Sequence, residues 1–335
     1  MAPESIDKYR IERELGSGTF ATVWLGYDPD LDRRVAIKVL GDNWSRNKDV
    51  RDRFLEEARI LWRLDDPRIV RVFDTRVTPE GQPYFVMEYA DAGSLQDRIQ
   101  QHIADKKFYT VTEAVTISRD IAQGLVVAHG HRIVHRDLKP SNILFSTSHV
   151  IGKGENGQPA ERLLMADFGI ARQLATSSGY TITAGTPYYM APEQADPRQG
   201  QGPDERADIY SAGVILYELL TNRVPYPFDS ISQIIHAQTA GDRPPIHELR
   251  PDVPDALAHA IDTALQPDPY HRYASAGEWS RALDQAVPLG TRQSQPEFTI
   301  DPEEYRRRLD EERRQQLNSG GKGGNNGSNH GGGGN

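Results

Sequence analysis

The stretch His135-Arg136-Asp137-Leu138-Lys139-Pro140-Ser141-Asn142 decides how the rest of this chain is interpreted. Within six residues it places a carboxylate at Asp137, an ammonium at Lys139 and an amide at Asn142. A loop this polar can simply be solvated. Short runs of Ile, Val, Leu and Phe flank it on both sides, however, and such runs are usually buried. The sequence therefore predicts a polar loop that is anchored in a hydrophobic core.

A second acidic motif, Asp167-Phe168-Gly169, follows the apolar run Leu163-Leu164-Met165. Asp167 thus stands at the end of a predicted buried strand. Carboxylate and amide oxygens are the ligands that Mg²⁺ prefers in proteins. If the chain folds Asn142 next to Asp167, the two side chains form an all-oxygen site suited to that ion.

Glycines lie upstream, in Gly16-Ser17-Gly18, between two predicted strands. Without a Cβ, such residues let the backbone approach phosphate oxygens closely. Taken alone, a strand–turn–strand with two glycines is more typical of an ordinary hairpin. It differs from a dinucleotide-binding fingerprint because no helix follows it.

The following predicted strand contains Val35-Ala36-Ile37-Lys38, in which Lys38 is the one charged residue among apolar neighbours. A lysine here can face water from an edge strand. If it points inward it needs an anionic partner, because an unpaired buried charge is costly. On a helical wheel of 100° per residue, Glu57 lies on the apolar face of the following helix and Glu56 points away. We therefore expect a Lys38–Glu57 pair that could hold Lys38 against phosphates.

Together and in this order, these motifs resemble those of a protein kinase, and most closely the bacterial, eukaryotic-like Ser/Thr kinases. The resemblance runs from about Tyr9 to Val287. It continues beyond Asp167 with the segment from Gly185 to Glu193. Further on it includes Asp208 in DIYSAG and Arg272 in DPYHRY.

The resemblance implies a role for each matching residue. The backbone of Gly16–Gly18 would cover the ATP phosphates, and Lys38, oriented by Glu57, would hold the α- and β-phosphates. Asp137 would accept the proton of the substrate hydroxyl, and Lys139 would neutralise charge on the γ-phosphate. Mg²⁺, or Mn²⁺ in its place, would be bound by Asn142 and Asp167. The expected nucleotide-binding residues are Leu15, Gly16, Ser17, Gly18, Val23, Ala36, Lys38, Met87, Glu88, Ala90 and Leu144.

Further implied roles are structural. An apolar column would hold the helix of Glu57 in place, and it would consist of Leu61, Val72, His135 and Phe168. Glu193 and Arg272 would form a buried ion pair, and Asp208 would anchor the catalytic loop from below.

The sequence pattern predicts an α+β chain with a small antiparallel β-sheet lobe and a larger, mostly helical lobe. Short apolar, β-branched segments predict strands at Tyr9–Leu15, Ala21–Tyr27, Val35–Leu40, Ile69–Val77 and Tyr84–Tyr89. The main helix of the small lobe is expected at Val50–Leu64, with Phe54, Ala58, Leu61 and Trp62 on one face.

After Gly93 the pattern becomes helical. Apolar residues recur at three- and four-residue spacing from Ala114 to Ala128, and Asp208–Leu220 is apolar nearly all round, which is typical of a buried helix. The expected organisation is a leader at 1–8 and a kinase domain at 9–287, divided into lobes at 9–90 and 91–287. A charged extension at 288–317, which is a helix candidate, and a Gly/Asn-rich disordered tail at 318–335 follow.

Composition limits the possible classes of protein. The 335 residues contain no cysteine, which excludes a disulfide scaffold, a cysteine zinc site and a cysteine nucleophile. A net charge of −9 argues against a nucleic-acid partner. No run approaches the roughly 18–20 apolar residues of a membrane span, and the N-terminus lacks the layout of a signal peptide. We expect a cytoplasmic chain.

Lys139 and Thr186 match the Ser/Thr-specific pattern of the family, so protein Ser/Thr hydroxyls are the expected substrates. The segment ATSSGYTIT, after Asp167, is rich in hydroxyls. It can be a simple flexible loop. Phosphate on it could also pair with Arg136 and Arg172. We expect autophosphorylation at Thr181 or Thr183, with Thr176, Ser177 and Ser178 as weaker candidates, and self-association would allow it to occur in trans.

Two departures from the family pattern stand out. Ala21 occupies the position of a third glycine, which predicts a slightly stiffer loop that still binds ATP. The interval from Asn142 to Asp167 is long, and the excess within 146–161 is expected to be a hairpin tip. It is either a docking element or a neutral surface insertion.

Two alternatives to an active kinase stay open. A pseudokinase scaffold would share the fold and bind ATP without turnover. Against it, Lys38, Asp137, Asn142 and Asp167 are all present. A small-molecule phosphotransferase of related fold is disfavoured by the segment from Gly185 to Glu193, which resembles peptide-substrate architecture.

Overall fold

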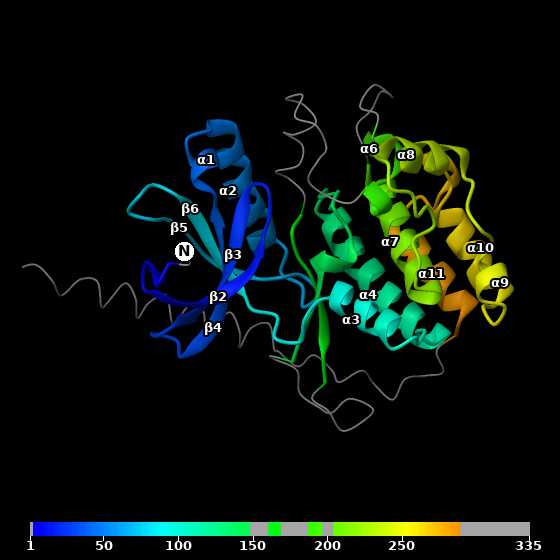
Figure 1. Ribbon diagram of the computed structural model, residues 1–335, viewed down its shortest axis with the longest axis horizontal. Helices are drawn as coiled ribbons and strands as arrows, with labels where there is room; N and C mark the ends of the chain where they lie inside the picture. Colours follow the sequence, from blue (N-terminus) through cyan, green and yellow to red (C-terminus); the bar gives the residue numbers. More distant parts are fainter. Residues whose placement is uncertain (1–2, 148–159, 169–186, 196–203, 289–335) are drawn as a thin grey trace, which may run out of the picture.

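The computed structural model describes residues 3–147, 160–168, 187–195 and 204–288. A small lobe built on a sheet lies beside a larger lobe built mostly of helices (Figure 1). The chain passes from the first lobe to the second between β6 (Pro83–Glu88) and α3 (Leu95–Ala104). The predicted two-lobed α+β fold is confirmed.

The small lobe contains a six-stranded antiparallel sheet in the order β1-β2-β3-β4-β6-β5. Its other strands are β1 (Ser5–Ile6), β2 (Tyr9–Ser17), β3 (Ala21–Asp28), β4 (Arg33–Leu40) and β5 (Val72–Val77). β1 lies within the segment expected to be a leader and pairs with β2. The strand expected from Ile69 begins only at Val72, because Ile69 instead forms a bridge with Met165 of the larger lobe.

Two helices follow β4, the short α1 (Asp42–Ser45) and the main helix α2 (Lys48–Arg63). The Asn47 side chain caps α2 by accepting a hydrogen bond from the Val50 amide. The placement of Trp62 on the buried face was wrong, because its side chain is 61% exposed. Trp62 lies one residue, or about 100°, beyond Leu61 at the edge of the buried stripe.

The larger lobe is organised around α4 (Val111–Gly130) and α7 (Glu205–Thr221), with α11 (Ala276–Ala286) packed against both (Figure 1). α7 is buried along nearly its whole length, as its all-round apolar sequence predicted. A Cβ on Gly213 would lie 2.9 Å from the Cβ of Ala264 in α10 (Asp255–Ala264), so glycine allows α7 and α10 to pack closely. The remaining elements are η1 (Pro140–Asn142), β7 (Ile143–Ser146), β8 (Arg162–Met165), η2 (Pro187–Tyr189), α6 (Pro192–Ala195), α8 (Ile231–Ala240), α9 (Ile246–Leu249) and η3 (Pro269–His271).

Several expectations fall outside the described residues. They concern most of the 146–161 insertion, the hydroxyl-rich segment with Thr176, Ser177, Ser178, Thr181 and Thr183, the residues Arg172, Gly185 and Thr186, and the two C-terminal segments at 288–317 and 318–335 beyond residue 288. Within the described ranges, no helix has both the length and the apolar character required to cross a bilayer.

Candidate active site

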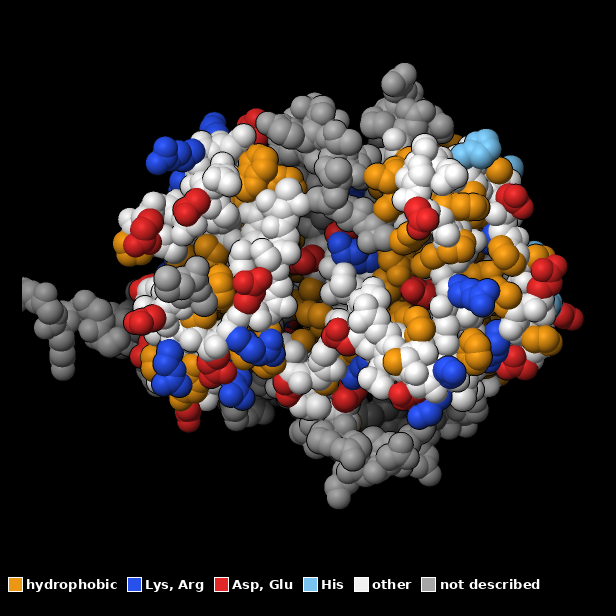
Figure 2. All heavy atoms as spheres, in the orientation of Figure 1, with side chains coloured by type: hydrophobic (Ala, Val, Ile, Leu, Met, Phe, Trp, Pro, Cys, Tyr) orange, Lys and Arg blue, Asp and Glu red, His pale blue; other side chains and the backbone are white. Residues whose placement is uncertain are grey.

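A cavity of about 720 Å³ lies between the two lobes. Every residue predicted to act in catalysis, nucleotide binding or metal binding lines it, although these residues come from six separate stretches of the sequence. Figure 2 shows the hollow between the lobes, with acidic and basic side chains on its walls. The volume falls within the range typical of small-molecule sites.

A second hollow, of about 820 Å³, lies on the small lobe and is lined by charged residues of both signs, among them Arg10, Glu12 and Arg33. Of the predicted site residues only Glu88 borders it. The chemistry predicted from the sequence is therefore concentrated in the cavity between the lobes.

Lys38 bridges the two lobes. It lies in β4, and its ammonium nitrogen is 2.6 Å from Glu57 Oε1 and 2.9 Å from Asp167 Oδ1. The expected Lys38–Glu57 pair is present, and the Glu57 side chain is only 3% exposed. Glu56, by contrast, is 41% exposed, as the helical wheel indicated.

The charges of these three groups depend on one another. Burial disfavours the charge on Lys38, but the carboxylates of Asp167 and Glu57 outweigh it and raise the pKa of Lys38. Burial raises the pKa of Glu57 to about 7 against the opposing charge of Lys38. Burial also opposes the charge on Asp167, but Lys38 outweighs it and holds the pKa of Asp167 below its ordinary value. At neutral pH Lys38 is therefore charged and Asp167 is ionised, whereas Glu57 exchanges a proton with solvent near pH 7.

The loop from His135 to Asn142 lines the cavity from the larger lobe through Asp137, Lys139, Ser141 and Asn142. Lys139 Nζ lies 2.9 Å from Asp137 Oδ2. The buried Asn142 amide donates to the Asp137 carbonyl oxygen at 2.8 Å and to its carboxylate at 3.3 Å. These contacts fix the Asp137 carboxylate beside one cation and one amide.

Asp208 of α7 anchors this loop from below. Its carboxylate accepts hydrogen bonds from the backbone amides of His135 and Arg136, both at 2.8 Å. His129 Nε2, at the end of α4, also lies 2.8 Å from it. Arg136 has a φ of +63°, a conformation that non-glycine residues adopt only at a cost of about 1–3 kcal/mol. The hydrogen bonds that the His135 and Arg136 amides donate to the buried Asp208 carboxylate help to hold this strained backbone in place.

The expected apolar column is buried throughout. Leu61 and Val72 are nearly inaccessible in the small lobe. His135 and Phe168 are fully buried and stack with ring centroids 4.4 Å apart. Burial lowers the pKa of His135, so the ring is neutral at physiological pH.

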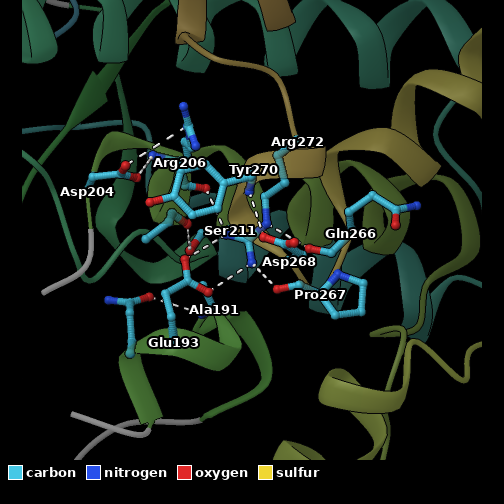
Figure 3. A network of polar contacts seen from close by, with 12 residues as sticks. Ala191, Glu193, Asp204, Arg206, Ser211, Gln266, Pro267, Asp268, Tyr270 and Arg272 are labelled. Atoms are coloured by element: carbon cyan, nitrogen blue, oxygen red, sulfur yellow. Dashed lines mark hydrogen bonds and ion pairs between the residues drawn. The ribbon is translucent and has the colours of Figure 1, made fainter. Parts of the chain in front are cut away.

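A network in the larger lobe centres on Arg272 (Figure 3). Its guanidinium forms the expected bidentate pair with Glu193, at 2.7 and 2.8 Å. It also donates to the backbone carbonyls of Arg206, Gln266 and Pro267. The pair therefore connects α6 to the first turn of α7 and to the segment that precedes η3.

Sequence reasoning missed some residues of the site. Asp97 lines the cavity and accepts hydrogen bonds from the Ser94 amide and hydroxyl in a capping box. That motif signals a helix start and does not by itself indicate a ligand. Arg162 of β8 forms a buried pair with Glu88, the residue at the boundary between the lobes. Nothing in the strand sequence indicated this partner.

The predicted donor set for a metal ion would consist of one carboxylate, Asp167, and one amide, Asn142, and both residues line the cavity. The described residues contain no group of three or more His, Asp or Glu side chains arranged as a metal site. Two oxygen ligands suit Mg²⁺, which usually keeps several waters and takes its remaining ligands from substrate phosphates. The residues therefore fit a metal that binds together with a nucleotide.

Comparison with known proteins places these features in context. A family model described as "Protein kinase domain" matches residues 9–284. The chain is 37% identical over 285 residues to the serine/threonine-protein kinase PknJ of Mycobacterium tuberculosis, covering 83% of this chain and 45% of the relative. It is 33% identical over 302 residues to PrkC of Bacillus subtilis, covering 89% of this chain and 43% of that relative. The chain thus spans less than half the length of these curated relatives.

Solved structures agree with the sequence comparison. The crystallised kinase domain of Mycobacterium tuberculosis PknI superposes with a TM-score of 0.64 at 26% identity. The match covers 85% of this chain and 99% of that domain.

Proposed function

This chain belongs to the protein kinase family, and from that premise we propose that it is an active Ser/Thr protein kinase. It would transfer the γ-phosphoryl group of ATP to Ser or Thr hydroxyls of proteins. The observation that supports this most strongly is the arrangement of Lys38, Glu57, Asp137, Asn142 and Asp167 around one cavity.

The chain's own groups suit phosphoryl transfer, in which positioning and charge neutralisation supply most of the rate enhancement. Lys38, held by Glu57, would bind the α- and β-phosphates. Asp137 would orient the substrate hydroxyl and accept its proton, and Lys139, 2.9 Å from Asp137, would offset charge on the transferred group. Mg²⁺, when bound by Asn142 and Asp167, would neutralise phosphate charge.

Protein Ser/Thr hydroxyls are proposed as substrates because Lys139 follows Asp137 by two residues and because the relatives at 33–37% identity are named Ser/Thr kinases. The buried pair between Glu193 and Arg272 supports a protein kinase rather than a small-molecule phosphotransferase, since the resemblance assigns this pair to peptide-substrate architecture.

We also propose that phosphorylation at Thr181 or Thr183 activates the enzyme, in trans within a transient dimer. Two arginines offer a receptor for the phosphate. Arg53 Nη1 and Arg136 Nε are buried and have no hydrogen-bond partner among the described residues. Burial lowers the pKa of Arg136; Asp208 opposes this shift and the nearby charge of Arg53 reinforces it. An anion between the two guanidinium groups would relieve their repulsion.

The kinase domain is proposed to extend over residues 9–287, and the enzyme to act in the cytoplasm with protein partners and no nucleic acid.

ATP-dependent labelling tests the enzymatic function. The purified chain is incubated with radiolabelled ATP, Mg²⁺ and a basic Ser/Thr-rich protein. Lys38→Ala and Asp137→Asn should each lower incorporation by at least about a hundredfold. Lys107→Ala, an exposed lysine of the larger lobe, is the matched control and should label like the wild type.

Equal labelling by the wild type, Lys38→Ala and Asp137→Asn would contradict the enzymatic proposal. Binding of an ATP analogue by a wild-type chain that labels nothing would instead support the pseudokinase alternative. Phosphopeptide mapping of the labelled chain tests the two threonines, and full activity with an unmodified loop would contradict their regulatory role.

A further inference from the structure

The glycine-rich loop, residues 16–20 at the turn from β2 to β3, is attached at its tip, Thr19 and Phe20, to the short helix α1. The Trp44 indole N–H donates a hydrogen bond to the Thr19 carbonyl oxygen at 2.9 Å. The Phe20 ring packs on Trp44 with centroids 5.0 Å apart and planes inclined at 55°. Tilted aromatic pairs at this separation are favourable beyond their burial. Both residues of the tip are therefore engaged by one side chain.

A backbone contact completes this attachment, which we call the Trp44 latch and define as the contacts of Trp44 and Gly41 with Thr19 and Phe20. The Gly41 amide donates to the Phe20 carbonyl oxygen at 2.8 Å. A Cβ at position 41 would lie 3.3 Å from that oxygen, so a glycine here lets the loop approach without displacement. The latch thus combines two hydrogen bonds and a ring contact.

The latched residues border the nucleotide cavity. Thr19 and Phe20 line the same cavity as Lys38 and Asp167. A Cβ built on Gly16 would meet nothing within 4 Å, so the space beside that glycine is open. The latch therefore sets the position of the loop over the region where Lys38 would hold phosphates.

The latch also connects the loop to the helix that carries Glu57. The Asn47 amide donates to the Trp44 carbonyl oxygen at 3.0 Å. The side chain of the same Asn47 caps α2. A displacement of α2 that separates Glu57 from Lys38 would therefore also pull on Trp44 and on the loop tip.

We propose that Trp44 is a positioning residue for the ATP phosphates, which rests on the proposed kinase function. By ordering the loop before the nucleotide binds, the latch lowers the conformational entropy lost on binding. The benefit is confined to the phosphates, because the sheet register places Ala21, the residue after the loop tip, beside Leu40 and two positions from the pair of Val23 with Lys38. Glu88, which precedes the passage to the larger lobe, pairs with Val35 at the other end of β4. Trp44 should therefore affect phosphate-bearing ligands and leave the nucleoside alone.

Calorimetry on the full chain tests this with two ligands, the non-hydrolysable ATP analogue AMP-PNP with Mg²⁺, and adenosine. Trp44→Ala should weaken AMP-PNP binding by about five- to tenfold, from the loss of one hydrogen bond and one aromatic pair. Adenosine binding should stay within about twofold of the wild type. Trp44→Phe, which keeps a ring but loses the hydrogen-bond donor, should have an affinity for AMP-PNP between those of Trp44→Ala and the wild type.

The double variant Phe20→Ala/Trp44→Ala should lose less binding free energy for AMP-PNP than the sum of the two single losses, since both substitutions disrupt the same contact.

Trp62→Ala is the matched control, because Trp62 lies on α2 and is 61% exposed. It should bind both ligands like the wild type. Wild-type affinity for AMP-PNP in Trp44→Ala and Trp44→Phe would overturn the inference. So would an equal loss for AMP-PNP and adenosine, which would indicate general damage to the small lobe. A wild-type chain that binds neither ligand would instead overturn the proposed function, and the inference with it.

Discussion

The Lys38 ammonium lies 2.9 Å from the Asp167 carboxylate, although the two residues are 129 positions apart in the sequence. Lys38 belongs to the small lobe and Asp167 follows β8 of the larger lobe. With the Lys38–Glu57 pair, this contact places one cation between two carboxylates in the wall of the cavity. Any nucleotide or metal that enters must compete with, or join, this arrangement.

Glu57→Gln should lower kcat/KM by roughly 10–100-fold, because the neutral amide orients Lys38 less strongly. The wild-type kcat/KM should fall as the pH drops through about 7, the pKa of Glu57, since protonation removes the carboxylate that orients Lys38. Glu57→Gln should not show this fall in kcat/KM at low pH. Glu56→Gln, on the exposed side of α2, should keep both the wild-type kcat/KM and its fall at low pH. An unchanged pH profile in Glu57→Gln would contradict this assignment.

Removal of Mg²⁺ with EDTA should weaken AMP-PNP binding by at least about tenfold, because phosphate charge would be left without its counter-ion. Asn142→Ala should reduce this dependence on Mg²⁺, which calorimetry with and without the metal measures. Ser141→Ala changes a neighbouring residue that lines the same cavity and should behave like the wild type. If Asn142→Ala keeps the full response to Mg²⁺, Asn142 is not a ligand.

Arg272→Met should destabilise the chain by about 3–5 kcal/mol, because it leaves the Glu193 carboxylate without its cation in a largely buried site. Urea denaturation followed by tryptophan fluorescence measures the change in the free energy of unfolding. Arg59→Met, which removes an exposed pair with Glu56, should cost about 0–1 kcal/mol. If both substitutions lower the free energy of unfolding equally, the burial of the Arg272–Glu193 pair does not contribute to stability, which would contradict this prediction.

Stability should fall as the pH drops below about 6.5, the ordinary pKa of histidine. The pKa of the buried His135 is lowered on folding, so below pH 6.5 the unfolded chain binds a proton that the folded chain does not. The loss is at most about 1.4 kcal/mol per pH unit from this group. His135→Phe, which preserves the stack on Phe168, should flatten the stability profile between pH 5 and 6.5. His131→Gln, at an exposed position, should not.

A chain that ends after Val287 should fold as stably as the full chain. Arg119 holds the end of α11 by donating to the Val287 carbonyl oxygen at 2.8 Å and by pairing with Asp284. A chain that ends after Arg281 loses the fully buried Leu283 and should be less stable by about 2–5 kcal/mol. Thermal unfolding distinguishes the two, and a large loss on trimming after Val287 would contradict the proposed domain boundary.

The sequence was sufficient to predict the two-lobed fold and the residues that line the cavity. Asp137, Asn142 and Asp167 stood out as polar residues beside apolar runs, but their roles followed from the resemblance of the ordered motifs to those of protein kinases. Glu57 could be separated from Glu56 because a helix has a fixed period. Only this second inference uses local geometry alone.

Contacts between distant segments could not be predicted in the same way. Trp44 and Thr19 meet because a loop and a short helix happen to be adjacent, and no periodicity encodes this. Arg162 reaches Glu88 across 74 positions, from a strand that is otherwise apolar. The error at Trp62 has a related cause, since the width of the buried stripe on α2 depends on the sheet beneath it rather than on the helix alone.

The burial of α7 has a consequence for how the enzyme would respond to heat. Asp208, which holds the catalytic loop, sits on a helix that is among the least accessible parts of the larger lobe. Segments of this kind open only when the whole lobe melts. The catalytic loop should therefore keep its conformation on warming until the larger lobe itself unfolds. Thermal inactivation and loss of structure should occur at the same temperature.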